Sequence, residues 1–307
     1  MATIVRRLGI VCTCGLLFTL FLALPIPAQS KGSLKIVFQV FSPKEGFNLG
    51  FSRLDGTERR KLTDSNRAIM PSFSADGDSL FFAEFTKTDL GMIPQIFQLD
   101  LKTNERTQLS DGSANDEYPR CSPDGQQLAF ITWSADRAKK DQPKIYLMDL
   151  QEKKRTPLDP EGDSPQLYPS WSPDGTKVVY AYLKVPLAVL KIRDLEKKTT
   201  DTFLPKKFYA TEPSWSPLGD QIAFTAWDPK AQSKTIWVVK VDGSDPQQIT
   251  QGPDDGHPAW FPDGRKLVFS HAEGQDRVIC EVDLATKKVK TLIKKENAKL
   301  EFPRIHQ

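Results

Sequence analysis

The chain is poor in the residues that most often carry catalysis or cross-links. Among 307 residues there are 4 cysteines and 3 histidines. Cys12 and Cys14 lie near the start, which leaves Cys121 and Cys280 in the rest of the chain. So few cysteines exclude a scaffold built on several disulfides. We expect no disulfide between Cys121 and Cys280, because they occupy different positions of the repeat described below.

The sequence also lacks a strong excess of charge of one sign, and it has no second long apolar run. The formal net charge is +3, too small to predict nucleic acid as a partner. A single uncharged, mostly apolar run covers residues 8–24, which excludes a protein with many membrane spans. A composition of 39% hydrophobic and 26% charged residues is ordinary for a globular protein and excludes a disordered chain.

The usual catalytic motifs are missing as well. The chain contains no G-x-S-x-G, no H-E-x-x-H, no paired C-x-x-C and no glycine-rich phosphate loop. We therefore predict that the protein is not an enzyme and has no resident metal or cofactor. His257 precedes a strand of the repeat, and we interpret it as a solvated loop residue, with a catalytic or metal-binding role as the alternative.

The first 28 residues are typical of a secretory signal peptide. Arg6 and Arg7 precede the apolar run, and Pro25-Ile26-Pro27-Ala28 follows it. We predict a signal peptide over residues 1–28 with cleavage after Ala28, a cut after Ser30 being nearly as favourable. An uncleaved membrane anchor is the alternative. Cleavage would leave residues 29–307 as a periplasmic or secreted protein without a transmembrane segment.

One heptapeptide recurs five times in the remaining chain. The copies are PSFSADG (71–77), PRCSPDG (119–125), PSWSPDG (169–175), PSWSPLG (213–219) and PAWFPDG (258–264). Their leading prolines are 48, 50, 44 and 45 residues apart. A period of this length predicts a stacked or radial array of small units.

Each heptapeptide predicts a turn between two strands. Proline fixes φ, aspartate bonds back to the backbone and glycine accepts a positive φ. Short runs rich in aromatic and β-branched residues follow the turn, as at residues 80–82, 96–100 and 107–109. We therefore predict four strands per unit, the first of them within the heptapeptide.

The two ends of the chain complete the pattern. Residues 302–305 restart the repeat, and residues 31–63 match the second, third and fourth strands of a unit. A mean period of about 46 residues fits six units into residues 29–307. We predict an all-β, six-bladed β-propeller of four-stranded blades, closed by one C-terminal strand that joins three N-terminal strands.

The W-S-P-D-G repeats resemble those of the TolB-like propellers, the PD40 repeat family. The resemblance covers residues 32–307, without the amino-terminal α/β domain that the family's namesake carries before its propeller. It implies a non-catalytic module that binds a peptide or an envelope protein at the mouth of the central channel. The alternative is a lyase or hydrolase that acts on a polysaccharide or peptide at the same mouth. A closed ring has no free sheet edge, so we expect a monomer.

The loops that lead into the innermost strands surround one mouth of a propeller. These six loops contain twelve acidic and four basic residues, whereas basic residues gather elsewhere, for example at Lys294 and Lys295. A basic partner segment or a bound cation would suit an acidic mouth. Solvated loops with Asp-based turns are the alternative interpretation.

We predict a binding site from the acids and aromatic residues of this mouth. Its expected members around the channel are Met70, Asp116, Glu117, Tyr118, Tyr168, Glu212, Asp255, His257, Glu301 and Phe302. Its expected rim is Phe85, Trp133 and Trp227. Tyrosine and tryptophan beside a polar rim are typical of binding hot spots, and packing between blades is the alternative.

Overall fold

The computed structural model describes residues 34–306 apart from 56, 137–140 and 205–207. The predicted signal peptide lies outside the described residues. Every regular element within them is a β-strand, and they contain no helix long and apolar enough to cross a membrane.

Four separate sheets have four antiparallel strands each. The first consists of β4 (Ala68–Phe73), β5 (Ser79–Thr88), β6 (Gly91–Asp100) and β7 (Arg106–Gln108). The second consists of β8 (Ala114–Cys121), β9 (Gln127–Ser134), β10 (Lys144–Asp149) and β11 (Arg155–Pro157). The third consists of β12 (Gln166–Trp171), β13 (Lys177–Lys184), β14 (Leu187–Asp194) and β15 (Thr199–Thr202). The fourth consists of β16 (Tyr209–Trp215), β17 (Gln221–Asp228), β18 (Ser233–Lys240) and β19 (Gln247–Gln248).

A fifth sheet of eight strands joins the two ends of the described chain. One half consists of β20 (Gly256–Trp260), β21 (Lys266–Glu273), β22 (Asp276–Asp283) and β23 (Val289–Ile293). The other half consists of β24 (Lys299–His306), β1 (Lys35–Ser42), β2 (Gly46–Arg53) and β3 (Arg60–Lys61). A single parallel pairing, Arg277 with Lys299, connects the halves. The C-terminal strand β24 pairs antiparallel with β1, as the sequence predicts.

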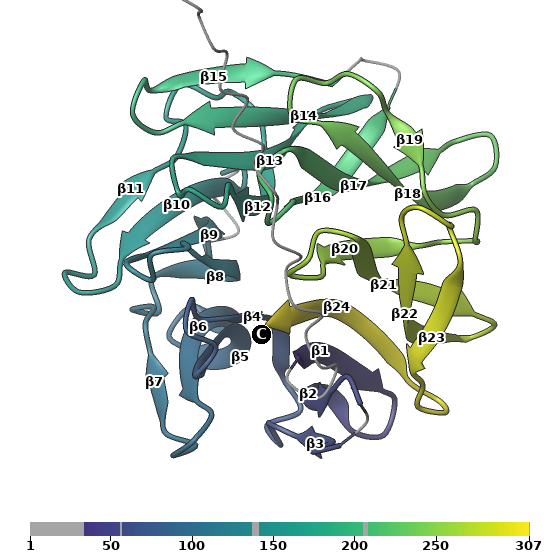
Figure 1. Cartoon of the computed structure of the whole chain (residues 1–307). Helices are drawn as coiled ribbons and strands as arrows, with labels where there is room; N and C mark the ends of the chain where they lie inside the picture. Colours follow the sequence, from purple (N-terminus) through teal and green to yellow (C-terminus); the bar gives the residue numbers. More distant parts are fainter. Residues whose placement is uncertain (1–33, 56, 137–140, 205–207, 307) are drawn as a thin grey trace, which may run out of the picture. The chain divides into compact units, whose positions relative to one another are not determined.

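The sheets are the blades of a β-propeller and follow one another around a common centre (Figure 1). Their first strands touch in the order β4, β8, β12, β16, β20 and β24, and β24 touches β4. The apolar core lies between adjacent sheets, for example where Phe81 of β5 and Phe130 of β9 share one buried cluster. The prediction of four-stranded blades in an all-β propeller is confirmed.

The heptapeptide forms the predicted turn between the first and second strands. In the first copy the Ser74 hydroxyl donates to Asp76 Oδ1 at 2.6 Å, and the Asp78 amide donates to the same oxygen at 3.0 Å. Gly77 closes the turn with a φ of 69°, which side chains rarely adopt. The turn therefore fixes where each innermost strand ends.

A bulge interrupts each innermost strand just before its proline. The residues there, Met70, Tyr118, Tyr168, Glu212, His257 and Phe302, are all left-handed, with φ between 52° and 57°. The pairing register shifts at these positions, for example between Glu117 and Arg120. These residues therefore belong to the strands and not to the preceding loops, where the sequence analysis placed them. Because the extra residue at a bulge leaves the ladder, pairing resumes on both sides of it.

Candidate functional site

The six left-handed residues meet in the centre of the propeller, and we call them the plug. The Tyr118 ring packs edge-on against Tyr168 at 4.8 Å and against Phe302 at 5.4 Å. The ring of His257 lies 3.9 Å from that of Phe302, and Met70 packs against the same cluster. Glu212 completes the plug, with its Oε1 3.3 Å from His257 Nε2.

The plug leaves little free space along the axis. The cavity that Tyr118, Glu212 and Phe302 line has a volume of about 10 Å³. That is roughly the room one water molecule needs. The predicted plug residues are therefore brought together, but they fill the channel, and a ligand has to bind beside them.

Glu212 bridges two neighbouring sheets within the plug. Its Oε2 accepts hydrogen bonds from the Thr225 hydroxyl at 2.7 Å and from the His257 amide at 2.8 Å. Burial pushes the pKa of Glu212 upward, but the hydrogen bonds and the charge of His257 outweigh burial and keep it below its ordinary value. Burial lowers the pKa of His257. His257 is thus packed in the centre, and not solvated in a loop as the sequence analysis expected.

Asp116 and Asp255, two of the predicted acids, have no exposed surface. Asp116 Oδ2 accepts from the Ser110 hydroxyl at 2.7 Å and lies 2.9 Å from Arg155 Nη2. Asp255 Oδ1 lies 2.7 Å from His271 Nδ1. Since both carboxylates are buried against partners in the same sheet, the structure does not offer them to a ligand at the mouth.

Glu117 and Glu301 are half-buried at equivalent places, next to the plug residues Tyr118 and Phe302. Glu301 lies 3.3 Å from Arg277 Nε and accepts from Gln39 Nε2 at 3.3 Å. Glu117 is different, because burial alone raises its pKa to about 7. Glu117 therefore changes charge near neutral pH beside the plug.

The three predicted rim aromatics have different surroundings. Trp133 packs against the buried cluster around Tyr118. Phe85 is half-buried on β5, and Trp227 is half-buried near the end of β17. Of the three, Trp227 lines a groove.

This groove, which we call the mouth groove, has a volume of about 730 Å³. It is lined by Pro186, Leu187, Phe208, Tyr209, Thr211, Thr225, Trp227, Pro229 and Lys234. The hairpin between β13 and β14 supplies one wall, and β16 and β17 supply the other. Leu187 is 39% exposed and Tyr209 is 37% exposed, and both lie with Trp227 in one mostly apolar lining. Thr225 connects the groove to the plug through Glu212.

Pro186, Leu187 and Tyr209 line the groove but are not among the site residues predicted from the sequence. A usable signal was present, because Val185-Pro186-Leu187 is an apolar tip between two strands where polar turn residues are usual. Val185 at this tip is 92% exposed.

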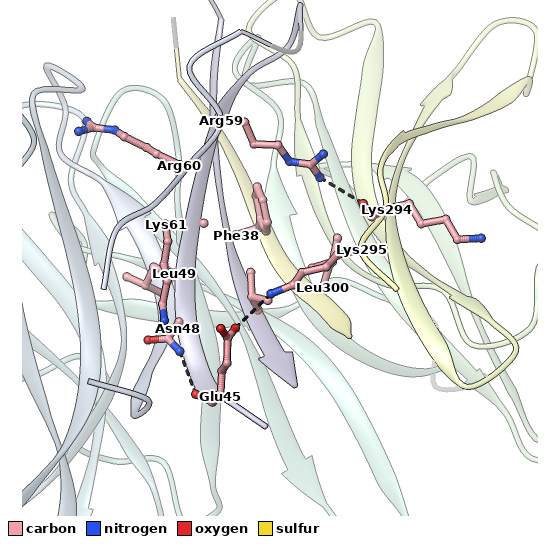
Figure 2. Close-up of a pocket in the computed structure, with 12 residues that line it drawn as sticks. Phe38, Glu45, Asn48, Leu49, Arg59, Arg60, Lys61, Lys294, Lys295 and Leu300 are labelled. Atoms are coloured by element: carbon pink, nitrogen blue, oxygen red, sulfur yellow. Dashed lines mark hydrogen bonds and ion pairs between the residues drawn. The ribbon is translucent and has the colours of Figure 1, made fainter. Parts of the chain in front are cut away.

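A second hollow, of about 260 Å³, lies where the chain ends meet (Figure 2). Five basic residues surround an apolar floor that includes Phe38, Leu49 and Leu300; they are Arg59, Arg60, Lys61, Lys294 and Lys295. Arg59 Nη2 donates to the Lys294 carbonyl at 3.3 Å, and Lys295 Nζ lies 3.2 Å from Glu45. The basic residues predicted to gather away from the mouth thus include two that line this hollow.

Within the part of the chain that the structure describes, no three His, Cys, Asp or Glu side chains gather as metal ligands. The thiols of Cys121 and Cys280 are both free. Burial raises the pKa of each thiol to about 11.

Comparison with known proteins gives consistent matches for this fold. The family model described as "TolB beta propeller domain" matches residues 31–304. The crystal structure of TolB from Acinetobacter baumannii superposes with a TM-score of 0.77 at 19% identity, covering 90% of this chain and 67% of that one. At this identity the likeness concerns the fold alone.

Two curated relatives are enzymes by name. Dipeptidyl-peptidase 5 of Porphyromonas gingivalis is 29% identical over 118 residues, which are 37% of this chain and 17% of that protein. Oligogalacturonate lyase of Dickeya dadantii is 26% identical over 266 residues, which are 75% of this chain and 66% of that protein. The chain thus spans about a sixth of the peptidase and about two thirds of the lyase.

Proposed function

The chain belongs to the TolB β-propeller domain family, and from that premise we propose that it is a non-catalytic binding protein that holds a peptide or protein segment in the mouth groove. The observation that carries this proposal is the groove itself. It combines exposed Leu187 and Tyr209 with Trp227 in a volume of about 730 Å³. Aromatic and proline walls with few charges suit an extended peptide.

The architecture we propose is a ring of six blades. The four separate sheets are four blades, and the halves of the eight-stranded sheet are two more. Two observations support this division: the halves share only one pairing, and the six first strands contact one another in a closed order. The blade that contains β24 then joins both ends of the propeller.

The lining of the mouth groove suits a segment with apolar side chains and little charge. Lys234 is the one charged residue among the groove-lining side chains, and it lies 3.6 Å from Asp254 Oδ1. Because Asp116 and Asp255 are buried, apolar contact in the groove would supply more of the affinity than the acids that the sequence counts at the mouth. We place the protein in the periplasm or outside the cell, on the basis of the signal-like residues 1–28.

A peptide selection with a mapping step tests the proposal. A displayed library of random peptides is selected on the protein, and hydrogen exchange is then measured with and without the selected peptide. The proposal expects slower exchange in the β13–β14 hairpin and in the β17–β18 segment. It is wrong if no peptide is selected, or if protection falls only on the face with the Pro-Asp-Gly turns.

The alternative function is an enzyme of the same mouth, and the similarity to oligogalacturonate lyase favours testing it. The test is incubation of the protein with oligogalacturonate, with and without added divalent cations, followed by measurement of chain length. Shortening that is lost when Tyr209 and Trp227 are both replaced by Ala would support catalysis in the groove. Unchanged chain length leaves the binding function as the better proposal.

A further inference from the structure

The face opposite the mouth groove carries a further hollow, distinct from the basic one of Figure 2 and formed where the innermost strands end. We call it the bowl; its volume is about 530 Å³, and its wall includes Trp171, Trp215, Trp260, Pro173, Pro217 and Arg304. The tryptophans and prolines all come from the repeated heptapeptide. The bowl is thus a product of the repeat and is separated from the mouth by the plug.

Two blades depart from the repeat at the residue after the leading proline. Four blades have a small residue there, Ser72, Ser170, Ser214 or Ala259, and the other two have Arg120 and Arg304. The strands that carry these arginines, β8 and β24, both contact β4. Arg120 and Arg304 also line the same small central cavity, and the charge of Arg304 acts on Arg120, so the two groups are neighbours there.

Neither arginine has an acidic partner among the described ion pairs. Arg120 Nη1 donates to the Pro119 carbonyl at 2.7 Å, and Arg304 Nη1 donates to the Pro303 carbonyl at 2.7 Å. Glu212 lines the same small central cavity, but its carboxylate already accepts from Thr225 and His257. A guanidinium has five N–H donors, and within the described part of the chain each of these two groups donates one hydrogen bond to the protein.

The surroundings of both arginines disfavour their positive charge. Burial is the main cause that lowers the pKa of Arg120, and the positive charge of Arg304 lowers it further. Burial also lowers the pKa of Arg304 to about 10, although the nearby Tyr118 and Glu212 act in the opposite direction. Both arginines are half-buried, and neither has a carboxylate within ion-pair distance among the described residues. A bidentate oxyanion is the ligand that guanidinium geometry fits best.

We propose that Arg120 and Arg304 form an oxyanion-binding site between the plug and the bowl, for a ligand that presents a carboxylate or phosphate group. The anionic group would lie on the two guanidiniums, and the rest of the ligand would extend over the tryptophan and proline wall of the bowl. The site lies on the other side of the plug from the mouth groove and does not depend on the proposed peptide binding.

Titration with sodium succinate and with inorganic phosphate, at constant ionic strength in chloride, tests the site. Tryptophan fluorescence is a direct readout, because Trp171 Nε1 donates to the Arg120 carbonyl at 3.0 Å and Trp171, Trp215 and Trp260 line the bowl. We expect saturable binding, and a rise of the melting temperature with the same anion. Tighter binding of succinate would assign a carboxylate ligand, and tighter binding of phosphate a phosphorylated one.

The variants Arg120→Ser and Arg304→Ser install the residue that three other blades have at this position. Each should weaken binding about tenfold or more, because it removes charge-assisted hydrogen bonds. Arg304→Lys keeps the charge without the planar fork and should give an intermediate affinity. Arg59→Ser, which removes one charge from the basic hollow of Figure 2, is the matched control and should bind like the unmodified protein.

Three results would overturn the proposal. They are no saturable response to either anion, an affinity in both serine variants equal to that of the unmodified protein, and loss of binding in Arg59→Ser alone. The melting temperatures of the serine variants without anion confirm that they fold, and we expect them to match or exceed that of the unmodified protein, since a like-charge pair is removed.

Discussion

Trp171 of β12 donates its indole N–H to the carbonyl oxygen of Arg120 in β8, at 3.0 Å, and so joins two neighbouring sheets. Trp260, two repeats later, makes the equivalent bond: its indole N–H donates to the Ser214 carbonyl at 2.9 Å. Trp171 and Trp260 therefore do more than fill space between blades, since each also hydrogen-bonds the blade before it, whereas Trp215 donates to the Gly219 carbonyl of its own turn at 3.3 Å.

Replacing Trp171 by Phe should lower the free energy of unfolding by about 1–3 kcal/mol, because the Arg120 carbonyl loses its indole donor at a buried boundary. Urea unfolding measures the change. Trp237→Phe is the control, since its indole donates to Thr235 on the same strand at 3.0 Å, and it should cost less. An equal loss of unfolding free energy in the two variants would mean that the hydrogen bond between sheets stabilises the fold no more than the one within a strand.

Alanine substitutions at two glycines distinguish the cost of backbone strain from the cost of a steric clash. Gly175 and Gly243 have φ of 72° and 82°, but a Cβ on Gly175 would meet only Pro123 Cδ at 3.8 Å, whereas one on Gly243 would lie 1.9 Å from the Phe203 carbonyl oxygen. Gly175→Ala should cost about 1–2 kcal/mol of unfolding free energy from the left-handed backbone alone. Gly243→Ala should lower the free energy of unfolding by clearly more, because the added Cβ would also clash with the Phe203 carbonyl oxygen. Thermal unfolding of both variants checks the order, and the reverse order would contradict the turn geometry.

Glu117 should make stability fall as the pH rises. Its pKa is about 7 in the folded protein because of burial, against 4.5 for a free glutamate. Between these values the folded state binds more protons than the unfolded state, so the free energy of unfolding decreases with rising pH across that window. Glu117→Gln should therefore be more stable than the unmodified protein by about 2–3 kcal/mol at pH 8.

The stability advantage of Glu117→Gln should shrink to a fraction of that value at pH 5, where Glu117 of the folded protein is already protonated. Denaturant unfolding at both pH values measures it. The exposed Glu152→Gln serves as the control and should show no such dependence. A Glu117→Gln variant whose advantage is the same at pH 5 and pH 8 would show that Glu117 does not titrate in this range.

The sequence predicts the repeating parts of the fold well because their causes are local. Proline, aspartate and glycine at fixed offsets determine the turn, as the Ser74–Asp76 hydrogen bond and the positive φ of Gly77 illustrate. The pairing of β24 with β1 also follows from counting repeats. These features need no knowledge of which side chains meet across the ring.

The candidate site is less predictable because its causes are not local. The acids of the loops were counted as if all faced solvent, but Asp116 is buried by Arg155, which lies 39 positions later on the outer strand of the same sheet. The left-handed bulge that turns Tyr118 into the channel has no separate sequence signal beyond the following proline. Arg120 and Arg304 were detectable, however, as the two departures from a small residue at one position of the repeat.

The affinity of groove variants for a selected peptide tests peptide binding in the mouth groove most directly. Leu187→Ser and Tyr209→Ser remove exposed apolar side chains of the groove, and Met92→Ser, at 49% exposure on β6, is a matched control away from it. We predict dissociation constants at least about tenfold higher for both groove variants, from loss of apolar contact at a hot spot, and an unchanged value for Met92→Ser. Equal affinity in all three variants would contradict binding in the mouth groove.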